Sequence, residues 1–483
     1  MSDILLALAL LPLLGVLAPF LVSPRLAGMV GAGCGVGTFA LVLALVGPVA
    51  SGRTPQVGIL RVDALSVVFL LATSFLYATT TIYTIGYLHE AHASARYSRL
   101  LLAGLSLFAW SMLIAPMANG LALIWIAVEV TTVVSALLVA IDDTDWASEA
   151  AWKYIVIGST GLGIALLATI FMYYAGAQVL GPSYDLDLVP LLAQASSLPH
   201  TPVLLAFCLA VLGFGTKVGL VPMHTWLPDA HAEAPAPVSA LLSGSLLAVS
   251  FYAVLRFYQV AAGTLGPTTP QRVLLVFGVA SLLLAALYLL DQRDIKRMLA
   301  YSSIEHMGIL AIGVSFGAPI ALGGVLLHVL AHAAAKGNAF MGAGVLTHAF
   351  ATKEVALIRG ARAVLPVSAP LFLGAVLALS ALPPFGIFRS EFQIVAGGLS
   401  SGRGQWAAVL VVLVTVAFFG LVGTSTRVVV GPAARSVVAA EPSALMVVAA
   451  LAGLLALLVL GVHPPAALNE LLTRGAGLLG RQP

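Results

Sequence analysis

Apolar runs, each about as long as a membrane-crossing helix, follow one another along almost the whole chain. A spanning helix needs about 20 mostly apolar residues. The runs lack the alternation of apolar and polar residues that is typical of a membrane β-strand. The pattern therefore predicts an all-α integral membrane protein with about fourteen transmembrane helices. We place these spans at residues 4–23, 27–47, 62–88, 98–117, 119–140, 152–174, 202–221, 236–261, 272–290, 298–317, 320–349, 364–396, 405–430 and 443–462.

The composition agrees with a protein surrounded by lipid. Of the 483 residues, 60% are hydrophobic and 8% are charged, whereas a soluble domain carries about 25% charged residues. The net charge of +3 is small and the basic residues form no stripe, so we expect no nucleic-acid partner. Two separated cysteines, Cys34 and Cys208, cannot ligate an iron–sulfur cluster. We therefore expect no cofactor, no metal ion and no catalytic centre in this chain.

Basic residues in the loops predict the orientation of the chain, because cytoplasmic loops carry an excess of Lys and Arg. Loops after odd-numbered spans hold twelve: Arg25, Arg96, Arg99, Lys153, Arg293, Lys296, Arg297, Lys353, Arg359, Arg362, Arg427 and Arg435. The opposite side holds seven: Arg53, Arg61, Arg256, Arg272, Arg403, Arg474 and Arg481. We expect a multi-pass protein of the plasma membrane with both termini external. The N-terminus has no basic leader, so its first apolar run reads as a retained helix.

Three basic residues remain outside this loop count, Lys217, Lys336 and Arg389, and each falls inside an apolar run. They are joined there by Glu129, Glu305 and Glu391. A charge in such a run costs ~3 kcal/mol on insertion scales. Such residues persist where they face a partner or water. Glu129, in the stretch WIAVEVTT, is either half of a buried ion pair or a proton-handling group, and we favour the second interpretation.

Lys217 lies in a run that proline should break, AVLGFGTKVGLVPMHTWLPDAH. Pro222 removes a backbone donor and clashes with the preceding turn. Broken helices at membrane depth are tolerated where they line a cavity, and they recur at transporter binding sites. Burial disfavours the charged form of a lysine, which suits a residue that must both take and release a proton. We therefore expect Lys217 and the nearby His224 to belong to a proton path.

The eleventh span carries His328, His332 and Lys336 at intervals of four residues, which places all three on one helical face. Two histidines four residues apart can bind zinc, but no third ligand is nearby in the sequence. Core packing is another interpretation. We favour a proton relay, because histidine gains and loses a proton near neutral pH, and we expect the helix to be broken near Gly337.

A second proline-broken run, LSALPPFGIFRSEFQI, places Arg389 and Glu391 after Pro383. Residues two apart on a helix do not face each other, so we do not pair the two charges. Glu305 and His306, in AYSSIEHMGIL, are either interfacial residues or part of the path.

The two breaks lie five spans apart, which predicts two inverted five-helix repeats. We divide the chain into residues 1–97 (helices 1–3), 98–262 (first repeat, helices 4–8), 263–430 (second repeat, helices 9–13) and 431–483 (last helix and external C-terminus).

Three stretches resemble a known family, the antiporter-like subunits of respiratory complex I, the Mrp antiporters and the group 4 membrane-bound hydrogenases. The most specific is GTKVGLVPMHTWLPDAHAEAPAPVSALLSG, supported by DIKRMLAYSSIEHMG and LPPFGIFRSEF. WIAVEVTT, EAAWKY and YSSIEHMG are most similar to the F-type subunit of hydrogenase-4. The resemblance covers roughly residues 60–430 and implies fourteen helices with two inverted repeats. With few residues after its last span, the chain is expected to lack the long lateral helix of the largest complex I pump subunit.

By motif, the resemblance implies roles for four residues. Glu129 matches the family's glutamate on the fifth helix, and Lys217 the lysine on the broken seventh helix. Lys336 matches the central lysine of the eleventh, and Glu391 the terminal acidic residue. Many members carry a lysine in the eighth helix, where this chain has Ala248. His328 and His332, or water, are then the candidates to connect Lys217 with Lys336.

We therefore expect a proton-translocating membrane subunit of a complex-I-like, redox-driven assembly of the hydrogenase or NADH/quinone oxidoreductase type. Its expected proton path is Glu129, Lys217, His224, Glu305, His328, His332, Lys336 and Glu391. Its expected partners are other membrane and peripheral subunits, lipid, and protons or sodium ions. The alternatives are an Mrp-type cation/proton antiporter, a coupling subunit for inorganic-carbon uptake, and a membrane scaffold that pumps nothing.

Overall fold

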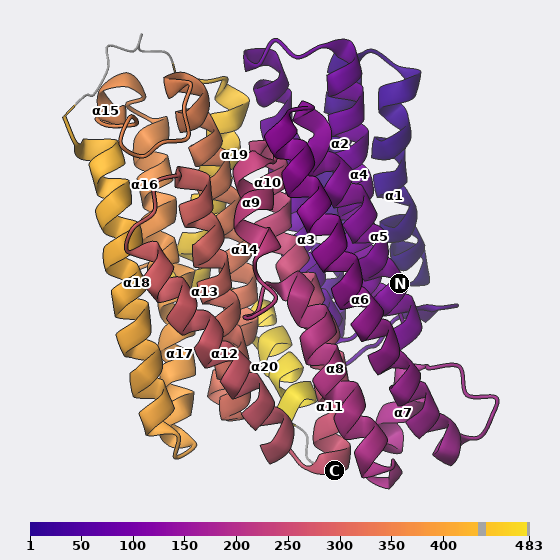
Figure 1. Ribbon diagram of the computed structural model, residues 1–483. Coiled ribbons are helices and arrows are strands. Elements are labelled where there is room, and N and C mark those ends of the chain that lie inside the picture. Colours follow the sequence, from indigo (N-terminus) through magenta and orange to yellow (C-terminus); the bar gives the residue numbers. More distant parts are fainter. Residues whose placement is uncertain (433–440, 481–483) are drawn as a thin grey trace.

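The computed structural model of the chain describes residues 1–432 and 441–480 and is almost entirely helical (Figure 1). Within those residues, thirteen helical segments are long and apolar enough to cross a membrane. The helices run side by side as a bundle (Figure 1). Arg435 and Arg481, which entered the charge balance, lie outside the described residues.

The first half of the chain supplies two short strands and the helices up to the first break. They are α1 (Ser2–Leu21), α2 (Pro24–Ala50), β1 (Gln56–Val57), β2 (Leu60–Arg61), α3 (Ala64–Glu90), α4 (Ala95–Met117), α5 (Leu121–Val139), η1 (Ala140–Asp142), α6 (Asp145–Leu180), α7 (Leu188–Ala193), η2 (Ala195–Ser197) and α8 (His200–Val218).

The second half continues from the first break to the C-terminus. It contains α9 (Trp226–Glu233), α10 (Ala236–Leu241), η3 (Leu242–Leu246), α11 (Leu247–Leu265), α12 (Thr268–Leu289), α13 (Ile295–Phe316), α14 (Pro319–Phe350), α15 (Ala361–Val364), α16 (Ser368–Leu379), α17 (Gly386–Ser400), α18 (Gly404–Val430), α19 (Ala444–Val462) and α20 (Ala466–Gly480).

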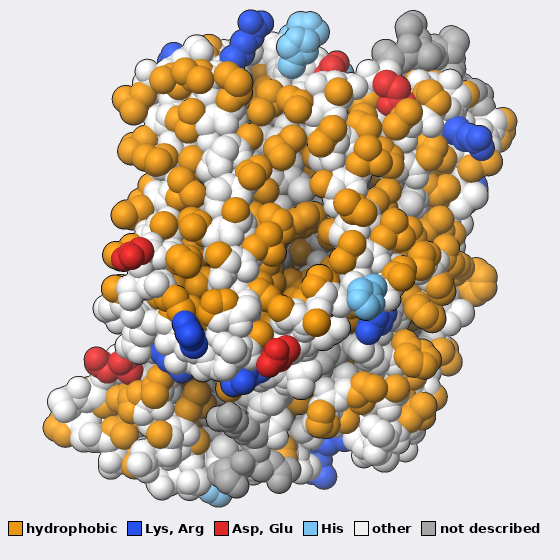
Figure 2. Space-filling model, turned by 180° about the vertical axis from the view of Figure 1, so that it is seen from behind, with side chains coloured by type: hydrophobic (Ala, Val, Ile, Leu, Met, Phe, Trp, Pro, Cys, Tyr) orange, Lys and Arg blue, Asp and Glu red, His pale blue; other side chains and the backbone are white. Residues whose placement is uncertain are grey.

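The surface has the polarity of a membrane protein. Figure 2 shows hydrophobic side chains over the middle of one face, with charged side chains gathered toward its two ends. Leu10, Leu137 and Phe419 are each more than 60% exposed. Because such exposure would be costly in water, this belt is suited to contact lipid. The central spans, 236–265 and 295–316, are buried in the bundle, whereas α19 lies at its edge.

Both predicted proline breaks are confirmed. The chain leaves helical geometry between the end of α8 at Val218 and the start of α9 at Trp226. It does so again between the end of α16 at Leu379 and the start of α17 at Gly386. The predicted span 364–396 is therefore two shorter helices, which accounts for thirteen continuous spans instead of fourteen.

The predicted break near Gly337 is wrong, because α14 runs without interruption from Pro319 to Phe350. A glycine inside a helix costs only about 1 kcal/mol relative to alanine, so it does not end a helix by itself. Its role here is close packing, since a Cβ at Gly337 would collide with the side chain of Leu76 on α3.

Among the elements that the sequence did not predict, the β1–β2 hairpin and helix α20 are described here because they pack against the N-terminal spans. The hairpin β1–β2 joins α2 to α3, and the amphipathic helix α20 follows the last span and packs back against α2, α3 and α14. Gln259 donates a hydrogen bond of 3.0 Å to the carbonyl of Leu478, and Arg474 donates one of 2.9 Å to the carbonyl of Ala50. These bonds hold α20 in the groove between the N-terminal helices and the centre of the bundle.

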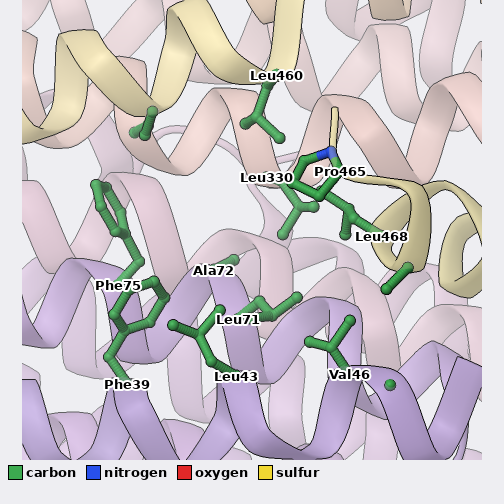
Figure 3. Close-up of a pocket in the computed structure, with 14 residues that line it drawn as sticks. Phe39, Leu43, Val46, Leu71, Ala72, Phe75, Leu330, Leu460, Pro465 and Leu468 are labelled. Atoms are coloured by element: carbon green, nitrogen blue, oxygen red, sulfur yellow. The ribbon is translucent and has the colours of Figure 1, made fainter. Parts of the chain in front are cut away.

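An apolar cavity of about 350 Å³ lies where α2, α3, α14, α19 and α20 meet. Phe39, Phe75, Leu330 and Leu460 are among the residues that line it (Figure 3). None of the residues that line it is titratable. The chemistry of this chain therefore has to be sought in the polar interior of the bundle.

Candidate functional site

Lys217 lies in the last turn of α8, which ends because Gly219 adopts a left-handed backbone with φ +82°. The negative end of the helix dipole favours a cation at this position. The break also frees backbone groups, and two side chains satisfy them. The indole N–H of Trp226 donates to the carbonyl of Thr216 at 2.7 Å, and the Val221 N–H donates to Ser281 of α12 at 2.9 Å.

The amine of Lys217 is fully buried and donates a hydrogen bond to the hydroxyl of Tyr154 on α6. It lies 4.4 Å from the centroid of the Tyr154 ring and 5.9 Å from that of Trp226, within range of cation–π attraction. The Tyr154 hydroxyl lies 2.7 Å from the Ser135 hydroxyl on α5. A polar chain therefore connects α8 through α6 to α5.

Glu129 is half-buried on α5 and forms no ion pair with Lys217. Among the described residues no ion pair joins the two side chains, and the Glu129 Oε2 atom has no hydrogen-bond partner there. The hydrogen bond that is formed by the Lys217 amine goes to the Tyr154 hydroxyl instead. His224 also stands apart. It is half-buried in the break, and no hydrogen bond described here joins it to another predicted path residue.

Lys336 occupies the middle of α14 and is fully buried. Its amine donates a hydrogen bond of 2.7 Å to the carbonyl of Leu299 and another to the hydroxyl of Ser302, both on α13. Glu305 lies one turn beyond Ser302 and is 4% exposed. The interfacial interpretation of Glu305 is therefore wrong, because its carboxyl is inside the bundle.

Hydroxyl groups lie beside Lys336 where the family pattern would place a lysine. The π-helical turn η3 presents Ser243, whose hydroxyl lies 2.7 Å from that of Ser303, the neighbour of Ser302. Ser245 of the same turn lies 2.7 Å from Thr73 of α3. Such π-helical turns are frequent at functional sites. These hydroxyls come from the turn that directly precedes Ala248 in α11.

The hydrogen bonds of the histidines lead to α17, and among the described residues none joins a histidine to Lys217. Nδ1 of His306 on α13 lies 3.0 Å from Nε2 of His328, and Nδ1 of His328 lies 2.9 Å from the hydroxyl of Ser390 on α17. The ring centroid of His332 is 5.1 Å from that of His306. The helical face predicted for α14 thus meets α13 and α17.

Glu391, next to Ser390, is 7% exposed and faces this histidine cluster. Arg389 donates a hydrogen bond of 3.4 Å to the carbonyl of Gly461 on α19. Its guanidinium therefore contacts α19 and is not paired with Glu391, as expected from their spacing. The fold therefore brings together Lys336, Glu305, the three histidines and Glu391, and keeps Lys217 with Tyr154.

Sequence reasoning missed several residues of this interior. Tyr154, Ser302 and Ser390 have ordinary polar side chains within apolar runs, and nothing in the sequence says which neighbour they meet. His231 is fully buried and stacks on Phe340, with ring centroids 4.9 Å apart. Lys296, assigned to a loop, is buried and donates to the carbonyls of Ala232 and Ala234. His231 could have been proposed from the sequence, because it lies within the stretch that most specifically resembles the family.

Comparison with known proteins adds three relationships in sequence. A family described as NADH:quinone oxidoreductase/Mrp antiporter, TM, matches residues 118–420. A hydrogenase-4 component F homolog from Methylacidiphilum infernorum is 35% identical over 368 residues, covering 75% of this chain and 77% of that protein. An NADH-quinone oxidoreductase subunit N from Desulforudis audaxviator is 36% identical over 273 residues, covering 56% of this chain and 53% of that protein.

Two solved structures share the fold over nearly the whole chain. A chain of the Mrp complex from Dietzia superposes with a TM-score of 0.85 at 20% identity, covering 98% of this chain and 97% of that one. A chain of respiratory complex I from Thermus thermophilus superposes with a TM-score of 0.83 at 25% identity, covering both chains completely.

Proposed function

The chain belongs to the NADH:quinone oxidoreductase/Mrp antiporter transmembrane family, and on that premise we propose that it moves protons across a membrane as one subunit of a redox-driven, complex-I-like assembly. The supporting observation is the series of buried titratable side chains from Lys217 through Lys336 to Glu391. Ionisable residues at membrane depth are costly, and they mark proton and ion paths. Electron transfer in this proposal takes place on partner subunits.

The first step of the proposed path is loading of Lys217. Its amine is stabilised in the charged form by the Tyr154 hydroxyl and by the carbonyl end of α8. A charged Glu129 on α5 adds to this stabilisation, and protonating or displacing it favours release of the lysine's proton. Tyr154 and Ser135 together form a hydroxyl chain along which a proton can be exchanged.

The second step delivers a proton to Lys336 through hydroxyl groups. The Ser243–Ser303 contact brings a polar group to the immediate neighbour of Ser302, which accepts a hydrogen bond from Lys336. Water between Tyr154 and this serine pair would complete the connection. Glu305, on the same helix as Ser302, supplies the negative charge that favours a charged Lys336.

The third step moves the proton from Lys336 to Glu391 through the histidines. The His306–His328–Ser390 hydrogen bonds run from α13 across α14 to α17, where Glu391 follows Ser390. Each imidazole can accept a proton on one nitrogen and release one from the other. Glu391 would then exchange the proton with one side of the membrane.

The two broken helices give the proposed path its symmetry. We assign residues 98–262 and 263–430 to two inverted repeats, with the breaks near Pro222 and Pro383 in corresponding positions. Residues 1–97 and 431–483 flank them. We propose that the chain binds further membrane and peripheral subunits, and the names of two relatives, a hydrogenase-4 component homolog and an oxidoreductase subunit, support this.

Gradient-driven exchange of a cation for protons is the second candidate. It is favoured by a protein from Rhizobium meliloti described as part of a K(+)/H(+) antiporter, which is 30% identical over 353 residues but matched over only 34% of its length. The relative matched over 77% of its length is a hydrogenase component homolog, and this is why redox coupling comes first.

The decisive experiment reconstitutes the purified parent complex in vesicles and follows a pH-sensitive dye during turnover. Lys217→Arg and Lys336→Arg keep a positive charge that cannot be released, so both should lose most proton movement while assembly is retained. Lys153→Arg is the matched control, because Lys153 is exposed on α6 and pairs with Glu149 at 2.7 Å. Wild-type pumping in both interior variants would favour the scaffold function. Sodium-dependent proton movement without redox turnover would favour the antiporter.

A further inference from the structure

Three side chains from three helices place possible metal ligands around one buried point. A proton path needs only successive contacts and does not require three ligands at a single point. His306 of α13, His328 of α14 and Glu391 of α17 each offer one ligand atom, and these atoms lie within 4.8 Å of one another. Both imidazoles are fully buried. In the sequence the third ligand was missing, because Glu391 lies far along the chain from the two histidines, and only the packing of α17 against α14 supplies it.

The hydrogen bonds determine which nitrogen of His328 carries its proton. The Ser390 hydroxyl lies 2.8 Å from the carbonyl of Ile387 and 2.9 Å from Nδ1 of His328. When the hydroxyl donates to that carbonyl, it acts as an acceptor toward His328, and Nδ1 of His328 is the donor. In the neutral ring Nε2 therefore bears a lone pair, and that lone pair faces Nδ1 of His306 at 3.0 Å.

We propose that His306, His328 and Glu391 form a binding site for a divalent transition-metal ion of the chemical class of zinc. Zinc prefers imidazole nitrogen and carboxylate oxygen at about 2.0–2.2 Å in tetrahedral geometry, which places neighbouring ligands about 3.3 Å apart. The two imidazole nitrogens are already at 3.0 Å, and the ligand atom of Glu391 lies within 4.8 Å of both, so binding needs a rotation of the rings toward a shared point and an approach of the Glu391 side chain. When the ion binds, the Nδ1 hydrogen of His306 moves to the Nε2 atom of the same ring, which has no hydrogen-bond partner among the described residues, so the ring stays neutral and offers its Nδ1 lone pair to the ion.

The surroundings complete the site in two ways. A metal-binding histidine usually donates its other N–H to an outer partner that fixes the ring, and Ser390 does this for His328. His332 can supply a fourth ligand, because neither of its ring nitrogens has a hydrogen-bond partner among the described residues and its ring is 5.1 Å from that of His306.

The charge of the ligand set fits a cation. A cavity of about 670 Å³ between α14, α17 and α20 lies nearby and is lined by Leu327, which precedes His328, and by the polar side chains of Gln393, Asn469 and Thr473, but not by the three ligand residues. An ionised Glu391 with two neutral imidazoles gives the ligand set one negative charge, which offsets part of the charge of a divalent ion. Glu305 lies on the same helix as His306, and Lys336 must be neutral for strong binding.

Metal binding itself is tested on the purified complex by equilibrium dialysis with Zn²⁺ and by the visible ligand-field spectrum of Co²⁺. We expect one ion per chain at this site and a tetrahedral Co²⁺ spectrum. His328→Ala and Glu391→Gln should abolish both signals, and Ser390→Ala should lower the affinity about 10- to 100-fold. His348→Ala, at an exposed histidine near the end of α14, should bind as wild type does. Absence of binding in the wild type, or equal binding in His328→Ala and Glu391→Gln, would overturn the site.

A consequence for transport rests on the proposed function. An ion held by His306, His328 and Glu391 would occupy the groups that connect Lys336 to one side of the membrane, so Zn²⁺ should inhibit proton movement in vesicles and Ser390→Ala should weaken that inhibition. The two proposals can fail separately. Binding of one Zn²⁺ per chain without inhibition of proton movement would support the metal site. The same result would contradict the proposal that protons pass through these histidines.

Discussion

Tyr154 of α6, and not Glu129, receives the hydrogen bond of the buried Lys217 amine, which also lies 4.4 Å from the Tyr154 ring centroid. The hydroxyl can accept from the charged amine and donate to Ser135, or donate to the neutral amine. Tyr154 can therefore serve both protonation states of the lysine, and a carboxylate can serve only one of them.

Tyr154→Phe should slow proton movement without preventing assembly, because it removes the acceptor of the lysine and leaves a buried amine unpaired. The expected loss of stability is ~1–3 kcal/mol. Tyr83→Phe is the control: Tyr83 is equally buried, and it loses one hydrogen bond of 2.9 Å to the carbonyl of Met341. Dye-monitored pumping in vesicles should fall in the first variant only. Equal pumping in both would mean that the Tyr154 hydroxyl only stabilises the fold.

Gly213→Ala should separate α8 from α6. A Cβ at Gly213 would lie 2.8 Å from the Cα of Ala165. A backbone atom cannot relieve this clash by changing rotamer, so the helices themselves would have to move apart. Overpacking of this kind costs ~1–3 kcal/mol, and the shift would also move Lys217 relative to Tyr154. Gly163→Ala on α6 is the matched control, because nothing lies within 4 Å of its added Cβ. In detergent, Gly213→Ala should unfold at a lower temperature than Gly163→Ala. An unfolding temperature of Gly213→Ala equal to that of the wild type would contradict the close packing of α8 against α6.

Asp63, directly before α3, should make the stability of the fold depend on acid pH. Burial alone raises the pKa of its carboxyl, but the Arg256 guanidinium at 2.7 Å and the Ser66 N–H more than offset this and bring it to about 2, below its ordinary 3.8. The folded chain then binds fewer protons at Asp63 than the unfolded chain does, so this contribution of about 2 kcal/mol is complete above about pH 4 and is lost as the pH falls toward 2.

Asp63→Asn should remove this acid dependence and destabilise the fold at neutral pH by ~3–5 kcal/mol, because Arg256 remains charged and buried without its partner. Unfolding midpoints measured from pH 7 down to pH 2 would test both effects. Asp185→Asn changes an exposed carboxylate and serves as the control. An acid profile of Asp63→Asn that runs parallel to that of the wild type would rule out Asp63 as its source.

The predicted orientation can be tested by cysteine labelling in intact cells after Cys34 and Cys208 are replaced. Asp291→Cys is a suitable position in the loop between α12 and α13, because Asp291 is exposed and is not the capping residue Asp294 of α13. A membrane-impermeant reagent should leave it unlabelled and should label Ser183→Cys in the loop after α6. The reverse pattern would place both termini in the cytoplasm.

The spans and the proline breaks were predictable because their causes are local. Lipid requires about 20 apolar residues for each crossing whatever lies beside the helix. Proline at 222 and 383 removes a backbone donor in any surroundings. Glycine carries no comparable penalty, and so the break predicted near Gly337 failed. Helix α20 escaped prediction because it is short, amphipathic and held by contacts with distant parts of the chain.

The residue types of the path were also visible in the sequence, since a lysine, glutamate or histidine in an apolar run is costly wherever it lies. Their partners were not visible. Whether Lys217 meets Glu129 or Tyr154, and whether His328 faces Lys217 or Ser390, depends on how α6, α13 and α17 turn against their neighbours. A hydrogen bond is made or lost over less than 1 Å, whereas the hydropathy of a span specifies only that it crosses the membrane. The sequence by itself determined which charges are buried, and only the packing of the helices decided which side chains they meet.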